Sequence, residues 1–223
     1  MDRNYYARGL SGERLDRVYA VADARVRQYL EAEIDHVAGG LAPGERLLEL
    51  GCGCGRVLAP LAKKAGAGWG VDNSTASLRL AARRHPGLHL AAMDIAALGF
   101  STGCFDAVIG IQNVVSACKV PPALILAEAL RVTRPGGRVI LSSYAEAFWP
   151  HRLDWFRRQA DEGLLGPIDE AATGGGVIAC TDGFQSTTLG PDDFEMLARA
   201  AGVTARVSTI DGSSVFCEIE VPE

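Results

Sequence analysis

The stretch Leu47-Leu-Glu-Leu-Gly51-Cys-Gly53-Cys-Gly55-Arg56 joins a run of apolar residues to a loop with glycine at every second position. Glycine permits positive φ angles in a tight turn, and the missing Cβ atoms let a bulky ligand lie against the backbone. The residues up to Lys64 then carry apolar side chains at helical spacing. The stretch therefore predicts a strand, a ligand-binding loop and a helix whose N-terminus faces the ligand.

The spacing of these glycines differs from the dinucleotide-binding pattern Gly-x-Gly-x-x-Gly. Counted from Gly51, the third glycine of that pattern would fall at Arg56, but Gly55 comes one residue earlier. A carboxylate just before the first glycine, at Glu49, suits a ligand with a cationic amino group better than a pyrophosphate. The stretch resembles motif I of the seven-strand S-adenosylmethionine-dependent methyltransferases, Glu/Asp-x-Gly-x-Gly-x-Gly. This resemblance implies S-adenosylmethionine as the cofactor, with its amino acid part near Glu49.

Two further acidic residues follow the ends of short apolar runs. Asp72 closes the run 68–71, about 20 residues beyond the loop, where a carboxylate can accept hydrogen bonds from ribose hydroxyls. Asp94 follows the run 88–92, and the resemblance implies that it contacts the adenine amino group. Each carboxylate alone could equally be an exposed strand-end residue. Their order and spacing after the loop favour ligand contacts, and Ser74 is expected to cap the intervening helix.

The middle of the chain predicts two more strands and a helix between them. A strand is expected at 105–111, a helix opens at Pro121-Pro122, and the turn Arg134-Pro135-Gly136-Gly137 precedes a strand at 138–143. This helix, turn and strand resemble those of small-molecule methyltransferases of the ubiquinone and menaquinone biosynthesis type.

The C-terminal residues predict a helix and a hairpin. Pro191 opens the helix, and two strand-like runs at 203–210 and 214–221 flank Asp211-Gly212-Ser213, which is a strong hairpin signal. We therefore expect an α/β fold of three layers: a doubly wound, mostly parallel seven-stranded sheet with an antiparallel C-terminal hairpin.

We expect residues 1–223 to form a single methyltransferase domain. Its parts would be an N-terminal arm and helix at 1–40, with one amphipathic helix over 13–37, and a cofactor-binding core at 41–143. An acceptor-side segment and insertion would follow at 144–190, with a small hairpin or loop over 163–184, and the final helix and hairpin at 191–223.

The candidate cofactor-binding residues share one place, the glycine loop and the ends of the strands that follow it. They are Glu49, Gly51, Cys52, Gly53, Gly55, Asp72, Asn73, Met93, Asp94, Ile95, Ile111 and Gln112. The candidate acceptor residues come from the N-terminal arm, the end of the fourth strand and the aromatic segment 144–158. They are Tyr5, Tyr6, Asn113, Tyr144, Trp149 and Arg152.

Two of these assignments have an ordinary structural alternative. His151 is a candidate general base because histidine titrates near neutral pH, but it could equally be a capping or core histidine. The arm that carries Tyr5 and Tyr6 either covers the pocket as a lid or rests on the surface.

Composition narrows the class of partners. The 223 residues are 48% hydrophobic, which suffices for a sizeable core. The net charge of -5 gives no electrostatic reason to expect binding to nucleic acid, which normally requires a basic face. The first residues do not read as a secretory leader, and no 18-residue apolar run suggests a membrane span, so a cytoplasmic location is expected. The six cysteines and four histidines lack the paired spacing of a zinc site, so we expect free thiols and no metal.

The expected function is transfer of a methyl group from S-adenosylmethionine to a nucleophilic atom of a small molecule, by a monomer or homodimer. Gln112-Asn113 departs from the Asp/Asn-Pro-Pro-Tyr motif, which argues against adenine in DNA and glutamine in protein as acceptors. Two alternatives stay open. One is a protein that binds S-adenosylmethionine without methyl transfer, and the other is a nicotinamide-dependent dehydrogenase, which Arg56 and the C-terminal hairpin disfavour.

Overall fold

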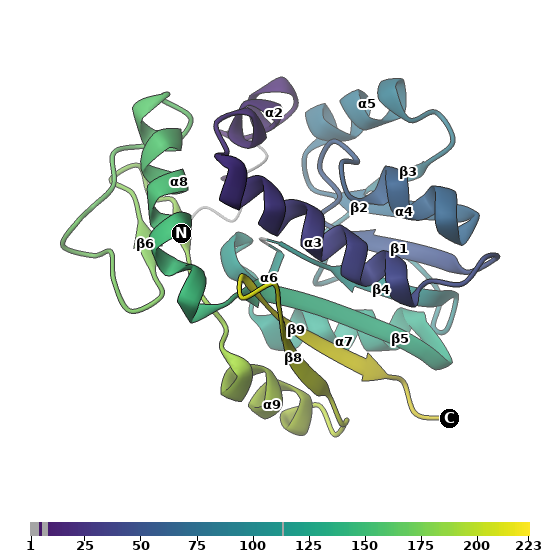
Figure 1. The fold of residues 1–223 in the computed structure, drawn as a ribbon. Coiled ribbons are helices and arrows are strands. Elements are labelled where there is room, and N and C mark those ends of the chain that lie inside the picture. The colour runs from purple at the N-terminus through teal and green to yellow at the C-terminus, as the bar shows by residue number, and fades with distance from the viewer. Residues whose placement is uncertain (1–4, 6–8, 113) are drawn as a thin grey trace.

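A seven-stranded sheet in the order β3-β2-β1-β4-β5-β9-β8 forms the centre of the computed structural model, which describes residues 5, 9–112 and 114–223 (Figure 1). Neighbouring strands from β3 to β5 run parallel, whereas β9 is antiparallel to both β5 and β8. This confirms the expected fold class. The strands are β1 (Arg46–Leu50), β2 (Ala67–Asp72), β3 (His89–Ala92), β4 (Phe105–Gly110), β5 (Thr133–Tyr144), β8 (Arg206–Ile210) and β9 (Ser214–Glu220).

Helices cover both faces of the sheet and complete the three layers (Figure 1). Leu47 of β1 packs with residues of α3, α4 and α5 on one face, and its neighbour Leu48 packs with residues of α7 and α9 on the other. This alternation follows from the two-residue period of a strand. The helices are α2 (Glu13–Ala20), α3 (Ala24–Gly40), α4 (Leu58–Ala65), α5 (Thr75–Arg84), α6 (Val114–Ala117), α7 (Pro122–Val132), α8 (Trp149–Asp161) and α9 (Pro191–Ala200).

The expected single helix over 13–37 is wrong, because the chain breaks between α2 and α3. The Asp23 side chain accepts a hydrogen bond from the Val26 backbone N–H at 2.8 Å and so caps a new helix. The apolar spacing runs across this break, since Val18 of α2 and Val26 of α3 belong to the same buried cluster. The break redirects α2 over the carboxyl edge of the sheet.

Two other local predictions are confirmed. Ser74 caps α5 by accepting a hydrogen bond from the Ser77 backbone N–H at 3.2 Å. Asp211 and Gly212 both have positive φ angles, 55° and 63°, which is the conformation of a two-residue hairpin turn. The β5 strand begins earlier than expected, at Thr133, and the Arg134–Gly137 turn is absorbed as an irregularity in its register with β4.

The segment between β5 and α9 stands beyond one end of the sheet (Figure 1). A short 3-10 helix, η1 (Glu146–Phe148), leads into α8, and the residues after α8 form the small hairpin of β6 (Ile178–Ala179) and β7 (Gln185–Ser186). Trp155 of α8 donates a hydrogen bond to the Val18 carbonyl at 3.0 Å and ties this segment to α2. In the described part of the chain, every helix is too short or too polar to span a lipid bilayer.

Candidate functional site

A cavity of about 260 Å³ lies where the carboxyl ends of β1, β2 and β4 meet α2 and α8. In open parallel sheets this edge is where ligands bind, because loops and helix N-termini converge there. The floor of the cavity comes from the glycine loop, and its outer walls come from α2, α8 and Tyr5.

The glycine loop has the backbone conformation that its sequence predicts. Gly51, Gly53 and Gly55 have φ angles of 67°, 50° and 80°, which side chains with a Cβ rarely adopt. Gly51 and Gly53 line the cavity. Gly55 does not, and a Cβ there would lie 3.1 Å from the His85 side chain. The predicted cofactor contact of Gly55 therefore has no support in this geometry, and this glycine lets the loop pack closely on α5.

Asp72, at the end of β2, holds the loop in place. One carboxylate oxygen accepts a hydrogen bond from the Gly53 backbone N–H at 2.8 Å, and the other accepts one from the Ser74 N–H at 2.7 Å. Each oxygen retains a second lone pair, so hydroxyl groups of a ligand can still donate to it. Burial raises the pKa of Asp72 above its usual value, and the backbone N–H groups of Ser74 and Gly53 oppose that shift.

Glu49, the last but one residue of β1, is an unusual carboxylate. Its side chain is 4% exposed, lines the cavity and has one oxygen, Oε2, without a hydrogen-bond partner among the described residues. Burial raises its pKa to about 8; the Arg56 guanidinium lowers the pKa, and Asp72 raises it. A cationic group placed against Oε2 would favour the ionised form and supply the missing partner.

Behind Glu49, an arginine and a glutamine form a polar wall. Arg56 donates a hydrogen bond to Gln112 Oε1, and its guanidinium lies 4.4 Å from the centre of the Tyr19 ring. Gln112 has a positive φ of 65°, its backbone N–H donates to Ser142 Oγ at 2.9 Å, and its Nε2 has no partner among the described residues. In the sequence, Arg56 served only to distinguish the loop from a dinucleotide-binding pattern. Its position between the glycine loop and α4 was a signal for a site residue.

The structure brings the candidate cofactor-binding residues other than Gly55 to one place. Eleven of the twelve line the cavity, namely Glu49, Gly51, Cys52, Gly53, Asp72, Asn73, Met93, Asp94, Ile95, Ile111 and Gln112. Asp94 lies at the exposed rim, where its carboxylate accepts a hydrogen bond from the Ala96 N–H at 2.9 Å.

The candidate acceptor residues divide into those at the cavity and those away from it. Tyr5 lines the cavity, and its hydroxyl donates to Asp182 at 2.6 Å. Tyr144, Trp149 and Arg152 are not among the lining residues. Tyr6 and Asn113 lie outside the described residues.

Arg152 instead holds the insertion in place. Its guanidinium is fully buried, lies 4.2 Å from the Tyr144 ring centre and donates to Ser186 Oγ at 2.8 Å and Thr188 Oγ1 at 2.6 Å. The first turn of α8 therefore faces the insertion and not the cavity. His151, in the same turn, is exposed and also absent from the lining, so the geometry does not support it as a general base.

Sequence reasoning missed Gln159 of α8 and the residues with which α2 reaches the site. Phe156 and Gln159 are three residues apart on one face of α8, and both line the cavity. The same spacing in the sequence could have identified that face. The further lining residues that the sequence analysis did not select include Leu10, Leu15, Val18, Tyr19, Cys118 and Lys119.

The sheet order, the antiparallel β9 and the glycine loop match the fold of the class I S-adenosylmethionine-dependent methyltransferases. Residues 47–137 match the family model described as a methyltransferase domain. Over 126 residues the chain is 38% identical to demethylmenaquinone methyltransferase from Beutenbergia cavernae, a match that covers 55% of this chain and 50% of that protein. The enzyme of the same name from Renibacterium salmoninarum is 33% identical over 132 residues, 57% and 53% of the two chains. The chain thus spans about half the length of the curated relatives it matches.

Solved structures show the same fold along almost the whole chain. A methyltransferase from Thermotoga maritima, described as a possible histamine N-methyltransferase, has a TM-score of 0.67 at 17% identity and covers 97% of this chain and 98% of its own. Magnesium protoporphyrin IX methyltransferase from Synechocystis, with bound S-adenosylhomocysteine, has a TM-score of 0.66 at 18% identity, with coverage of 98% and 97%.

Proposed function

We propose that the protein transfers the methyl group of S-adenosylmethionine to a nucleophilic atom of a small-molecule acceptor. The observation that carries this proposal is the buried Glu49 side chain, which lines the cavity and whose Oε2 has no protein partner among the described residues. The ammonium group of S-adenosylmethionine would complete this site. Nicotinamide dinucleotides have no ammonium group. The methyltransferase domain match over 47–137 supports the same conclusion.

The residues of the cavity would bind and orient the cofactor. Glu49 would accept a hydrogen bond from its ammonium group, Asp72 would accept hydrogen bonds from the ribose hydroxyls, and Asp94 would contact the adenine amino group. Gly51 and Gly53 leave room for it against the loop. The cofactor supplies an activated methyl group: the new bond to the acceptor forms as the carbon–sulfur bond breaks, and sulfur keeps the electron pair as S-adenosylhomocysteine leaves.

Positioning alone can supply a large part of such a rate enhancement. Holding two reactants in line contributes roughly 7 to 11 kcal/mol to lowering the barrier in favourable cases. The described residues that line the cavity include no histidine. We therefore propose an acceptor whose reacting atom ionises readily, such as a phenol, an enol or a thiol. The relatives named demethylmenaquinone methyltransferases support an acceptor of the hydroxyaromatic class.

The first test is calorimetric titration of the purified protein with S-adenosylhomocysteine, NADH and NADP⁺ in parallel. Micromolar binding of S-adenosylhomocysteine alone is expected. Glu49→Ala should weaken this binding at least tenfold, whereas Glu195→Ala, at an exposed position of α9, should leave it unchanged. Preference for a nicotinamide, or unchanged affinity of the Glu49 variant, would contradict the proposal.

The second test separates an enzyme from a binding protein. Release of S-adenosylhomocysteine is measured with a panel of hydroxyaromatic, thiol and amine acceptors. Turnover with any acceptor supports methyl transfer, and binding without turnover across the panel would favour a cofactor-binding protein. A cytoplasmic location, and a monomer or homodimer as the working form, remain part of this proposal, and light scattering after size-exclusion chromatography tests the oligomeric state.

A further inference from the structure

The outer part of the cavity is built by segments that lie before and after the matched methyltransferase residues. Val18 of α2 and Phe156 of α8 are buried there, 6% and 2% exposed, together with Leu10 at 2%. The Trp155 hydrogen bond to the Val18 carbonyl holds the two helices together at this point. A molecule in this part of the cavity meets mainly apolar and aromatic side chains, which suits a flat, largely apolar acceptor.

One polar side chain interrupts this apolar wall. Gln159 lies one turn beyond Phe156 on α8, is 2% exposed and lines the cavity. Its Nε2 has no hydrogen-bond partner within the described part of the chain. A buried amide donor without a partner is costly, and such groups in native structures call for a specific explanation.

Neighbouring polar groups of the cavity wall already have partners. The Tyr5 hydroxyl donates to Asp182, and the Lys119 ammonium donates to the Gly183 carbonyl at 2.6 Å. Gln112 has an unpaired Nε2 as well, but it follows β4 beside the glycine loop, on the cofactor side. Gln159 is therefore the unpaired donor that α8 offers to the acceptor side.

The backbone carbonyl of Gln159 has hydrogen-bond partners of its own. The Gln159 carbonyl accepts hydrogen bonds from the Leu164 N–H at 2.8 Å and the Leu165 N–H at 3.4 Å, which closes the C-terminus of α8. Because these bonds use only the backbone, the side-chain amide is free for recognition, and its replacement leaves the helix end intact.

We infer that Gln159 determines acceptor specificity, by donating a hydrogen bond from Nε2 to an oxygen atom on a flat, apolar acceptor. This inference rests on the proposed function and adds the residue that recognises the hydroxyl or carbonyl oxygen of an aromatic or conjugated acceptor. A hydrocarbon of the same shape would leave the amide unpaired in the complex and would bind more weakly.

The test compares two probes of nearly equal shape, 2-naphthol and 2-methylnaphthalene, by ligand-detected NMR titration of protein saturated with S-adenosylhomocysteine. The wild-type protein should bind 2-naphthol about tenfold more tightly, the ratio expected for one neutral hydrogen bond to a buried amide. Gln159→Leu and Gln159→Met, which remove the donor at similar length, should each reduce the ratio to about one. Gln185→Leu, the same change at an exposed position of β7, should keep it.

Several outcomes would overturn the inference. They are equal binding of the two probes, no binding of 2-naphthol to the wild-type protein, and a preference that survives in the Gln159 variants. A loss of S-adenosylhomocysteine affinity in those variants would move Gln159 to the cofactor side and also overturn it. Failure of the proposed function is a separate result, because S-adenosylhomocysteine would then not bind to the wild-type protein at all.

Discussion

Burial holds the carboxyl group of Glu49 protonated at neutral pH, since its pKa is raised to about 8. A cationic ligand group prefers the ionised form, so its binding must release this proton. The residue thus couples ligand affinity to pH, although it lies within a sheet strand and is 4% exposed.

We predict that S-adenosylhomocysteine binds more weakly as the pH falls from 7.5 to 5.5. In this range the α-amino group of the ligand stays protonated, whereas the ionised fraction of Glu49 in the free protein falls about tenfold per pH unit. The dissociation constant from calorimetry should therefore rise by up to tenfold per unit. Glu49→Gln should bind weakly with little dependence on pH, and a flat wild-type profile would contradict the role of Glu49.

At the scale of elements, α3 carries a second buried carboxylate away from the cavity. Glu33 is fully buried, and burial raises its pKa to about 7; the nearby hydroxyl groups of Ser142 and Ser214 oppose the shift. A carboxyl group with a raised pKa in the folded state favours folding at low pH, and this contribution is lost as the pH rises from about 4.5 to about 7. The docking of α3 on the sheet is thus strongest with Glu33 neutral.

We predict that Glu33→Gln stabilises the protein at pH 8 and has little effect at pH 5. The neutral amide matches the protonated acid in shape and removes the cost of ionising a buried group, about 1 to 3 kcal/mol. Thermal unfolding of both proteins from pH 5 to 8 measures the difference. Glu31→Gln, at an exposed position of the same helix, is the control. A variant that is less stable at pH 8 would contradict the prediction.

The elements also show where sequence patterns stop being informative. The strand and loop at 47–56 could be predicted because alternate glycines and an apolar run act locally. The orientation of α8 could not, because Arg152 is held by residues 24 to 36 positions later, at Gly176, Ser186 and Thr188. Long-range contacts of this kind turned the first turn of α8 away from the cavity and moved His151, Trp149 and Arg152 out of the lining.

The break between α2 and α3 was missed for a different reason. Its signal, Asp23 before a helical run, was present in the sequence, but the apolar spacing continued across it. Burial in one shared cluster outweighed helical continuity, and Tyr19 at the end of α2 reached the cavity as a result.

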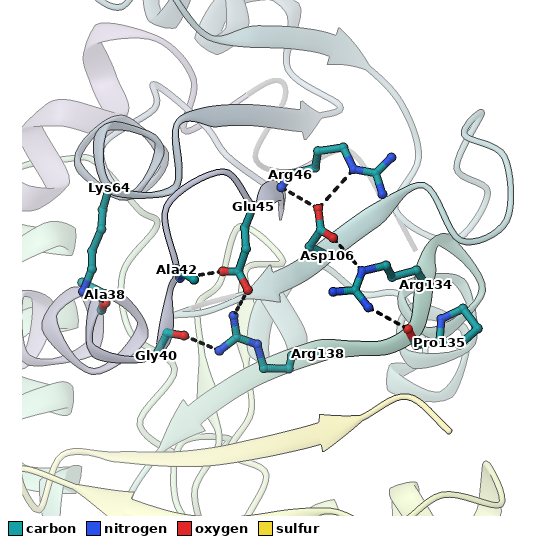
Figure 2. Close-up of polar contacts among 10 residues, drawn as sticks. All are labelled: Ala38, Gly40, Ala42, Glu45, Arg46, Lys64, Asp106, Arg134, Pro135 and Arg138. Atoms are coloured by element: carbon teal, nitrogen blue, oxygen red, sulfur yellow. Dashed lines mark hydrogen bonds and ion pairs between the residues drawn. The ribbon is translucent and has the colours of Figure 1, made fainter. Parts of the chain in front are cut away.

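At the scale of the whole molecule, the edge of the sheet opposite the cavity is held by ion pairs (Figure 2). Asp106 lies between two arginines: one oxygen accepts from Arg134 Nε at 2.6 Å, and the other accepts from the Arg46 backbone N–H at 2.8 Å and its Nε at 3.1 Å. Arg138 donates to Glu45 and to the Gly40 carbonyl. These contacts join the starts of β1, β4 and β5.

We predict that Asp106→Asn lowers the free energy of unfolding by about 1 kcal/mol at pH 7, because it removes charge-assisted hydrogen bonds at a largely buried position. Burial alone would raise the pKa of Asp106, but Arg134 and Arg46 lower it to about 2. A lowered pKa stabilises the folded state above about pH 4, and this contribution is lost as the pH falls towards 2.

Urea unfolding between pH 7 and pH 2.5 checks this prediction, and the gap between wild type and variant should narrow below pH 4. Glu170→Gln breaks an ion pair with Arg157 in which both side chains are about half exposed or more, and it should change stability very little. An equal effect of the two substitutions would show that the Asp106 pairs contribute no more than surface charges do.

The mostly parallel direction of the strands and the antiparallel C-terminal hairpin could be predicted at this scale, because β-α-β crossovers and a terminal hairpin permit few arrangements. The division of the chain into the four parts expected from the sequence stays a prediction.

The walls of the acceptor side, α2 and α8, lie outside residues 47–137, which carry the glycine loop and the ends of β1, β2 and β4. These two sets of residues can therefore change independently during evolution. Substitutions in the flanking segments can change which molecule is recognised without disturbing the residues that we propose bind the methyl donor. An exchange of those segments between relatives would transplant the choice of acceptor while leaving donor affinity in place.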